Sequence, residues 1–448
     1  MLKLLDLRGD RSDAAGRLPR PPADLRDRVA ATVREILDAV RSDGDGALAR
    51  YTKAFDGWDG SDFVVPAASA QAALETLSAP LRAALERMVE QVRWFAQRSR
   101  PADWREERDG ALLGVVHRPL RRVGVYVPGG RAPLVSSVVM TVVPARVAGV
   151  DEVVLCTPPG PEGRIDPAIL AAAALAGVDR IVRVGGAQAV AAMAFGTESV
   201  PRCDKIVGPG NVYVNEAKQQ VAAQGRVGID LPAGVTEVAV IADDTADPRA
   251  VAADLVGQAE HDPLVTALLI TPSAALIAAV ESALAEQVPA QRHRERVRAA
   301  LEGQGAAVLV DDLDHAVEVA DAFAAEHLEV LTADAAAVAG RVRAAGVVFV
   351  GPHSPVSVGD YGIGPNHTLP TGGSAHFTGG LRTDDFLVPV NWVELGAPAL
   401  AAAAPLVEAL AAAEDLPAHA DAVRVRLGPR AGAREPGHDP VDGSEGRP

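Results

Sequence analysis

From Val123 onward, short runs of β-branched residues alternate with Ala-rich stretches, and this alternation restricts the fold more than any other feature. The strand-like runs lie at 123–127, 153–156, 181–184 and 205–207. Parallel strands need crossover connections of about a dozen residues or more, and the intervening Ala-rich stretches are long enough to supply them. The pattern therefore predicts a parallel sheet with crossover helices.

A second series of the same kind follows, with strand-like runs at 237–242, 264–271, 307–310, 328–332 and 347–350. Helices are expected from Pro248, over 315–325 and over 335–345, and apolar spacings of three and four predict helices between 24 and 98. We expect an α/β fold of two Rossmann-like doubly wound domains, with a helical N-terminal segment and a small C-terminal helical domain. The predicted parts are an N-terminal arm (1–24), a first α/β domain (25–125 with 237–381), a second Rossmann-like domain (126–236), a C-terminal helical segment (382–427) and a disordered tail rich in Gly, Pro and charge (428–448).

Charge and cysteine content narrow the class of protein. The 448 residues include 43 Lys and Arg against 59 Asp and Glu, which gives a formal net charge of −16. A surface this acidic repels phosphate backbones, so we expect no nucleic-acid partner. Cys156 and Cys203 lack CxxC spacing and fit a reducing cytoplasm. No uncharged stretch has the length and composition of a membrane span, so a cytoplasmic protein without a membrane partner is expected.

Three Gly-rich turns follow strands of the first series, in VYVPGGRAP, VGGAQAV and VGPGNVYV. None is a GxGxxG or GxxxxGK[ST] fingerprint. Such turns place backbone N–H groups at helix N-termini, which suits an anion, although any one of them could simply reverse the chain. Three at the carboxyl ends of strands in one sheet favour a ligand crevice.

Two polar pairs stand out as candidate functional residues. Gln258 and His261 lie three residues apart near the end of the helix from Pro248, along a stripe that also contains Asp254. A histidine at a helix C-terminus can simply interact with the helix dipole. Glu326 and His327 lie where a helix meets a strand, where both can face one cleft and act as an acid–base couple. A solvated helix end is the alternative.

Two further groups are less regular. The segment 351–373 carries Asp360 and His367 among many Gly and Pro residues and is too long for an ordinary turn. Glu414 and His419 interrupt an Ala-rich stretch near the C-terminus, where a solvated surface is the default interpretation.

Taken together, six blocks resemble the histidinol dehydrogenase family: RVGVYVPGGRAPLVSSVVMTVVPARVAG, VGGAQAVAAMAFGTESVPRCDKIVGPGN, IDLPAGVTEVAVIAD, GQAEHD, EHLEVLT and GDYGIGPNHTLPTGG. The resemblance runs in order from about residue 20 to 427. It implies a cytoplasmic, intertwined homodimer whose active site is shared across subunits, with one Zn²⁺ per subunit and NAD. The implied reaction oxidises L-histidinol through L-histidinal to L-histidine, the last steps of histidine synthesis.

The resemblance also implies roles for individual residues. The implied zinc ligands, which also surround the substrate, are Gln258, His261, Asp360 and His419, the last reaching across from the partner subunit. The implied catalytic pair is Glu326 and His327; the other substrate contacts are Thr236, His367 and Glu414, together with His327; the NAD contacts are Tyr126, Gln188 and Asn211. Thr236 stands where many relatives have Ser, and the hydroxyl is retained.

The chemistry of the implied ligands suits zinc, although it does not exclude other transition metals. With one anionic ligand the site would keep a formal charge of 2 − 1 = +1, and four protein ligands would leave zinc to orient the substrate. Three alternatives remain open from the sequence. A related zinc and NAD dehydrogenase could oxidise another amino alcohol or a sulfonated diol, a zinc hydrolase could use Glu326 to activate water, and a metal-binding interaction module would need no catalysis.

Overall fold

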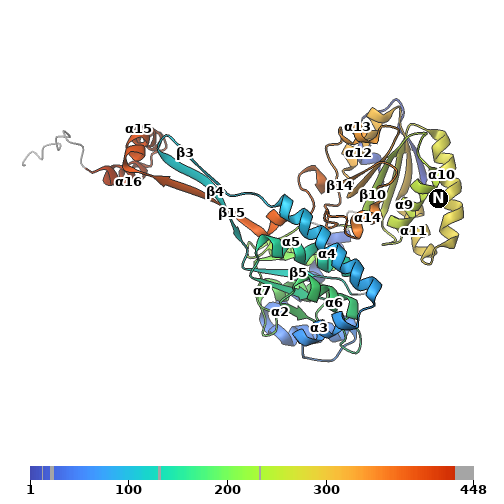
Figure 1. The fold of residues 1–448 in the computed structure, drawn as a ribbon, viewed down its shortest axis with the longest axis horizontal. Coiled ribbons are helices and arrows are strands. Elements are labelled where there is room, and N and C mark those ends of the chain that lie inside the picture. Colours follow the sequence, from blue (N-terminus) through green and yellow to red (C-terminus); the bar gives the residue numbers. More distant parts are fainter. Residues whose placement is uncertain (13, 21–24, 130–132, 232–233, 429–448) are drawn as a thin grey trace, which may run out of the picture. The chain divides into compact units, whose positions relative to one another are not determined.

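Two six-stranded sheets organise most of the chain in the computed structural model (Figure 1). The structure describes all residues except 13, 21–24, 130–132, 232–233 and 429–448. The first sheet has the order β1-β12-β11-β10-β13-β14, and all its neighbouring strands are parallel. Its strands are β1 (Lys3–Asp6), β10 (Glu237–Ala242), β11 (Thr266–Thr271), β12 (Gly305–Leu309), β13 (His327–Leu331) and β14 (Val347–Val350).

Helices cover both faces of this sheet because its central strands are apolar on both faces. In β10, Val238 and Val240 belong to one buried cluster, whereas Ala239 and Ile241 belong to another. Successive side chains of a strand point to opposite faces, so a continuous apolar run buries both. The helices of this half are α1 (Ala14–Arg17), α9 (Pro248–Ala259), α10 (Ala274–Ala290), α11 (Arg294–Gln304), α12 (Leu313–Phe323), α13 (Ala335–Ala339) and α14 (Val356–Asp360).

The second sheet has the order β2-β7-β6-β5-β8-β9, with β2 antiparallel to β7 and the other pairs parallel. Its strands are β2 (Val64–Val65), β5 (Arg122–Tyr126), β6 (Glu152–Cys156), β7 (Arg180–Val182), β8 (Lys205–Val207) and β9 (Gly228–Ile229). The helices of this half are α2 (Leu25–Asp56), α3 (Ala67–Thr76), α4 (Ala79–Ser99), α5 (Val135–Ala148), α6 (Pro167–Ala176), α7 (Gly186–Phe195) and α8 (Val212–Ala223). The expected α/β fold with parallel sheets is confirmed.

The boundary predicted between the two α/β domains is wrong for the N-terminal helices. We expected 25–125 to accompany the first sheet, but α2 packs on α7 and α8, α3 on α6, and α4 on α5. Strand β5 likewise lies inside the second sheet, between β6 and β8. Hydrophobic periodicity identifies an amphipathic helix but does not say which sheet its apolar face will cover.

A second compact unit, formed by 101–118 and the described residues from 389 to 428, departs from the all-helical C-terminal segment predicted for 382–427. The three-stranded sheet that enters it has the order β15-β4-β3, and a helical hairpin follows. Its elements are β3 (Trp104–Arg108), β4 (Ala111–Pro119), β15 (Leu387–Leu395), α15 (Ala397–Ala413) and α16 (Pro417–Leu427). Nearly all residues of β3 and β15 are exposed, so these strands lack the one-sided burial that gives a clear alternating pattern.

The N-terminal arm contributes β1, which pairs in parallel with β12 at the edge of the first sheet. The helix predicted over 335–345 ends at Ala339, next to Gly340. Nearly all of the predicted tail lies outside the described residues. Within the described residues, no helix combines the length and apolarity needed to cross a membrane.

Candidate active site

Glu326 and His327 lie at the expected junction between a helix and a strand. Helix α12 ends at Phe323, and Ala324 takes a left-handed conformation (φ 53°) that turns the chain. Glu326 follows in the connection, and His327 is the first residue of β13. Both side chains are buried, with residue exposures of 8% and 4%. The alternative of a solvated helix end is therefore wrong.

Hydrogen bonds join this pair to the start of β10 and the end of α9. Oε2 of Glu326 accepts from the Glu237 N–H at 3.0 Å and from the Thr236 hydroxyl. The Thr236 Oγ1 in turn accepts from Nε2 of Gln258 at 2.7 Å. Nδ1 of His327 lies 3.1 Å from the Glu237 carbonyl oxygen. Four of the predicted residues thus form one network.

Burial moves the pKa values of the pair in opposite directions. It raises the pKa of Glu326 to about 7, with a further increase from the charge of Asp360 and an opposing effect of the bonds from Thr236 and Glu237. Burial lowers the pKa of His327, and Asp360 partly offsets this effect. Near neutral pH the imidazole is therefore uncharged, and the carboxyl is close to half-ionised. A carboxyl with a raised pKa next to a neutral imidazole is typical of a site that transfers protons.

The carboxylate of Asp360 interacts electrostatically with two further predicted histidines, His261 and His367. His367 Nδ1 lies 3.7 Å from Asp360 Oδ1. Burial alone would raise the pKa of Asp360, but the hydrogen bond from His367 and the charges of His327, His367 and His261 lower it overall. Burial lowers the pKa of His261, which favours a neutral ring with a free lone pair. Nε2 of His367 is buried and has no protein partner, so it can bond to a ligand.

The site lies at the amino ends of its strands. Thr236 precedes β10 and His327 begins β13, and these two strands are paired with Val238 opposite His327. Helix α9 begins at an Asp247 N-cap followed by Pro248, as expected, and its last turn carries Gln258. A small pocket of about 20 Å³ adjoins this site, and its lining includes His327, Phe349 and His367.

Among the described residues, no three His, Cys, Asp or Glu side chains gather closely enough to hold a metal ion. The predicted set places only two residues of these types, His261 and Asp360, in the first unit, beside the amide of Gln258. His419 lies in α16 and Glu414 caps the end of α15. Both belong to the second unit and are exposed, and their roles stay predictions.

The three residues predicted for NAD follow strands of the second sheet. Tyr126 ends β5, and its hydroxyl oxygen accepts from the Gly186 N–H at 3.2 Å. Gln188 lies in the first turn of α7; its side chain is buried, and neither amide atom has a protein partner. Asn211 follows β8 and caps α8 by accepting from the N–H groups of Tyr213 and Val214. Because buried polar groups are normally hydrogen-bonded, the unpartnered amide of Gln188 is suited to contact a ligand.

Sequence reasoning missed two buried acids near the catalytic pair. Glu237 is 1% exposed, and burial together with the charge of Glu326 raises its pKa to about 7. Glu329 is fully buried in β13, and burial beside Asp254 raises its pKa. The sequence did carry a signal for both acids, because each is the one charged residue of an otherwise apolar strand. Glu237 begins EVAVIA, and Glu329 lies in HLEVL, where the histidine is counted as neutral.

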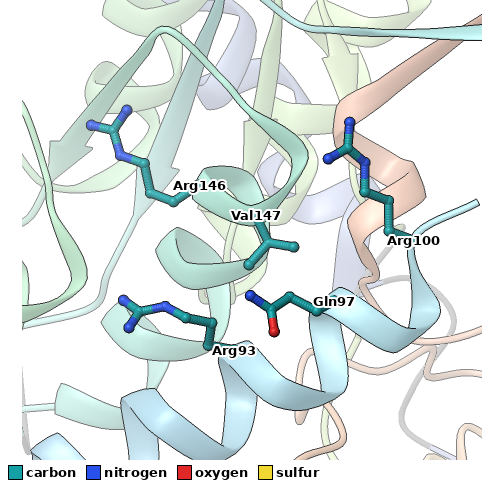
Figure 2. A pocket seen from close by; sticks show the side chains of 5 residues that line it. All are labelled: Arg93, Gln97, Arg100, Arg146 and Val147. Atoms are coloured by element: carbon teal, nitrogen blue, oxygen red, sulfur yellow. The ribbon is translucent and has the colours of Figure 1, made fainter.

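A larger cavity, of about 440 Å³, lies away from these residues, between α4 and α5. Figure 2 shows its three arginines, Arg93, Arg100 and Arg146, with guanidinium groups that point in different directions. Arg146 already bonds to the Gly177 carbonyl and to Asp179. The cavity is therefore no part of the candidate active site.

Comparison with known proteins identifies the family. The histidinol dehydrogenase family model matches residues 19–427. The histidinol dehydrogenase of Parasynechococcus marenigrum is 49% identical over 400 residues, covering 89% of this chain and 91% of the relative. That of Thermobifida fusca is 48% identical over 431 residues, covering 95% and 98%.

A solved structure extends the agreement to the fold. The crystal structure of histidinol dehydrogenase from Elizabethkingia anophelis is 34% identical and superposes with a TM-score of 0.90, covering 95% of this chain and 98% of that one. The resemblance seen in the sequence blocks is confirmed by these matches. The chain belongs to the histidinol dehydrogenase family of NAD-dependent oxidoreductases.

Proposed function

We propose that this protein is a zinc-dependent histidinol dehydrogenase that oxidises L-histidinol through L-histidinal to L-histidine while two NAD⁺ are reduced. Family membership supports the reaction class. The observation that carries the assignment of roles is the buried couple of Glu326 and His327, held by Thr236, Glu237 and Gln258. A diol or another amino alcohol is the competing substrate class, and the amide, imidazole and carboxylate groups around Asp360 favour a substrate with an amine and an imidazole.

His327 is proposed as the base that removes the alcohol proton. A backbone carbonyl only accepts, so the contact to Glu237 assigns the hydrogen to Nδ1 of the neutral ring. With the hydrogen on Nδ1, the 3.4 Å contact between Gln258 Nε2 and His327 Nδ1 joins two donors and is not a hydrogen bond. The basic lone pair is then on Nε2, which can accept the hydroxyl proton as hydride leaves the adjacent carbon.

Glu326 is proposed to activate the water that hydrates the aldehyde. Its Oε2 is held by Thr236 and the Glu237 N–H, which leaves Oε1 to accept a proton. With a pKa of about 7, the carboxylate is basic enough to take a proton from water as that water attacks the carbonyl carbon. Two residues of different pKa thereby serve two successive proton removals.

Gln258, His261 and Asp360, with His419 of the partner subunit, are proposed to hold one zinc ion per subunit in a homodimer. The chemistry of the residues in this chain fits the ion, because they offer an amide oxygen, a neutral imidazole and an ionised carboxylate. When bound, zinc supplies a positive charge that orients the amine and imidazole of the substrate. Tyr126, Gln188 and Asn211 are proposed to bind NAD.

Substitution of His327 tests the proposed base. His327→Asn is expected to lower turnover by about 10²–10⁴ while zinc content is retained. The matched control is His315→Asn, since His315 is equally buried but bonds to Asp311 near α12. Full activity in His327→Asn would remove this residue from the mechanism.

Parallel assays of NADH production with histidinol and with sulfonated diols separate the two substrate classes.

A further inference from the structure

A buried ion pair contacts the turn Gly208–Asn211, which connects β8 to α8. Lys218 of α8 and Asp230, which follows β9, form a salt bridge in which both side chains are 1% exposed. Neither belongs to the candidate active site or to the residues assigned to NAD. Taking two charges out of water is costly, and a well-packed apolar pair of similar volume often does as well or better for stability. A buried pair of this kind therefore calls for a reason other than stability.

Both partners bond to the same residue of the turn. Lys218 Nζ donates to the Gly208 carbonyl oxygen at 3.0 Å, and Asp230 Oδ2 accepts from the Gly208 N–H at 2.7 Å. The pair thus fixes the peptide groups on both sides of Gly208. Gly208 has φ +113°, and a Cβ there would lie 2.2 Å from the Tyr126 carbonyl oxygen. The clamped residue accordingly packs against the backbone of another proposed NAD contact.

The same helix holds the rest of the turn. Asn211, Asn215 and Lys218 follow the i, i+4, i+7 spacing of one helix face. Asn215 Nδ2 donates to the Gly210 carbonyl oxygen at 2.8 Å, and Asn211 caps the helix. Among the described residues, the N–H groups of Gly210 and Asn211 donate to no protein acceptor. Two free donors at the start of a helix are suited to an anionic group of a ligand.

We propose that Lys218 and Asp230 are positioning residues that hold the turn Gly208–Asn211 in the conformation that binds the dinucleotide. This inference rests on the proposed function, because it assumes that the turn binds NAD. The pair touches no reacting atom and acts through the backbone of Gly208 alone. Its loss should therefore weaken NAD binding, whereas the chemistry at Glu326 and His327 in the other sheet is retained.

The decisive variant is the apolar double substitution Lys218→Met with Asp230→Leu in the full-length zinc-loaded protein. It removes both charges together, so no buried charge loses its partner. We expect a folded protein with a lowered Tm, because the N–H and the carbonyl of Gly208 lose their partners. Zinc content and the KM for histidinol should be unchanged, and the KM for NAD should rise about tenfold or more because the turn is misplaced. The control is Arg82→Gln with Glu86→Gln, which removes an exposed ion pair from α4.

A normal KM for NAD in a folded double variant would overturn the proposal, and so would an equal loss in every kinetic parameter. If the double variant does not fold, Asp230→Asn provides the second test with an isosteric side chain. Hydrogen exchange of the peptide over 205–211 should then be faster than in the wild type, and unchanged protection would contradict the clamp. A wild-type protein without NADH production would instead refute the proposed function and leave the exchange result valid.

Discussion

The hydroxyl of Thr236 connects two proposed functional side chains, since it donates to Glu326 and accepts from Gln258. Its bond to Glu326 stabilises the ionised carboxyl and lowers its pKa against the effect of burial. Thr236→Val keeps the shape and removes the hydroxyl, so the pKa of Glu326 should rise above about 7. A hydrogen bond to a charged group contributes about 1.5–3 kcal/mol, and kcat/KM should fall roughly 10- to 100-fold at neutral pH.

The pH profile distinguishes this effect from a general loss of structure. Glu326 acts as a base only when ionised, so kcat/KM should decrease as the pH falls below about 7 in the wild type. In Thr236→Val this acidic limb should move to higher pH. Thr236→Ser retains the hydroxyl and should leave both the rate and the limb unchanged. An unshifted limb in Thr236→Val would show that the hydroxyl does not tune Glu326.

At the scale of elements, helix α9 carries Gln258 at its C-terminal end and is capped by Asp247 at its start. Asp247 Oδ1 accepts from the Arg249 N–H at 2.8 Å. Asp247→Ala should cost about 1 kcal/mol, which corresponds to a small fall in Tm, because the shift in Tm per kcal/mol decreases with chain length. Catalysis should persist, because the cap lies about three turns from Gln258. Thermal unfolding and NADH production measure the two effects.

Asp166→Ala is the matched control, since Asp166 caps α6 in the other sheet with the same 2.8 Å bond and the same following proline. Both variants should lose similar stability. A folded Asp247→Ala protein with little activity would mean that the start of α9 contributes directly to the site, contrary to a purely stabilising role for this cap.

The elements that the sequence predicts well are those buried on both faces of a sheet. Runs such as 237–242 and 328–332 are apolar throughout most of their length and lie between Ala-rich helices, so their type follows from composition and length. Strand β3 (WREER) has every residue exposed and is held by pairing with β4. Backbone pairing of this kind leaves little hydrophobic periodicity, and the hairpin could not be predicted.

The candidate site was predictable only where its residues are close together in the sequence. Glu326 and His327 are adjacent, and Gln258 and His261 share a helix turn, so local spacing identifies each pair. Their convergence depends on the pairing of β10 with β13 and on the return of α9 toward the amino ends of these strands. Neither follows from local sequence, and the grouping came from resemblance to a family. Glu237 was not predicted as a site residue, although it is the one charged residue of an otherwise apolar strand.

At the scale of the whole molecule, the proposed site needs two subunits. Glu326 belongs to the first compact unit and His419 to the second, and His419 of the partner subunit is the proposed fourth zinc ligand. Glu326→Gln and His419→Ala should each be inactive as homodimers. When they are co-expressed, a mixed dimer contains one site with both native residues, and random pairing should restore about a quarter of the sites.

Activity and zinc content of the separated mixed dimer provide the measurement. A mixed dimer without activity would place Glu326 and His419 of one site in the same chain, or exclude His419 altogether. Co-expression of Glu326→Gln with His327→Asn is the control, because both changes fall in the first unit. The mixed dimer of that pair should stay inactive.

In the proposed function, one site carries an amino alcohol through two successive oxidations. The most direct test is the amount of NADH released per histidinol consumed, measured to completion with wild-type protein and excess NAD⁺. We predict a ratio of about two, with histidine as the product, because each oxidation removes one hydride. A ratio of about one, with accumulated aldehyde or no histidine, would contradict the claim.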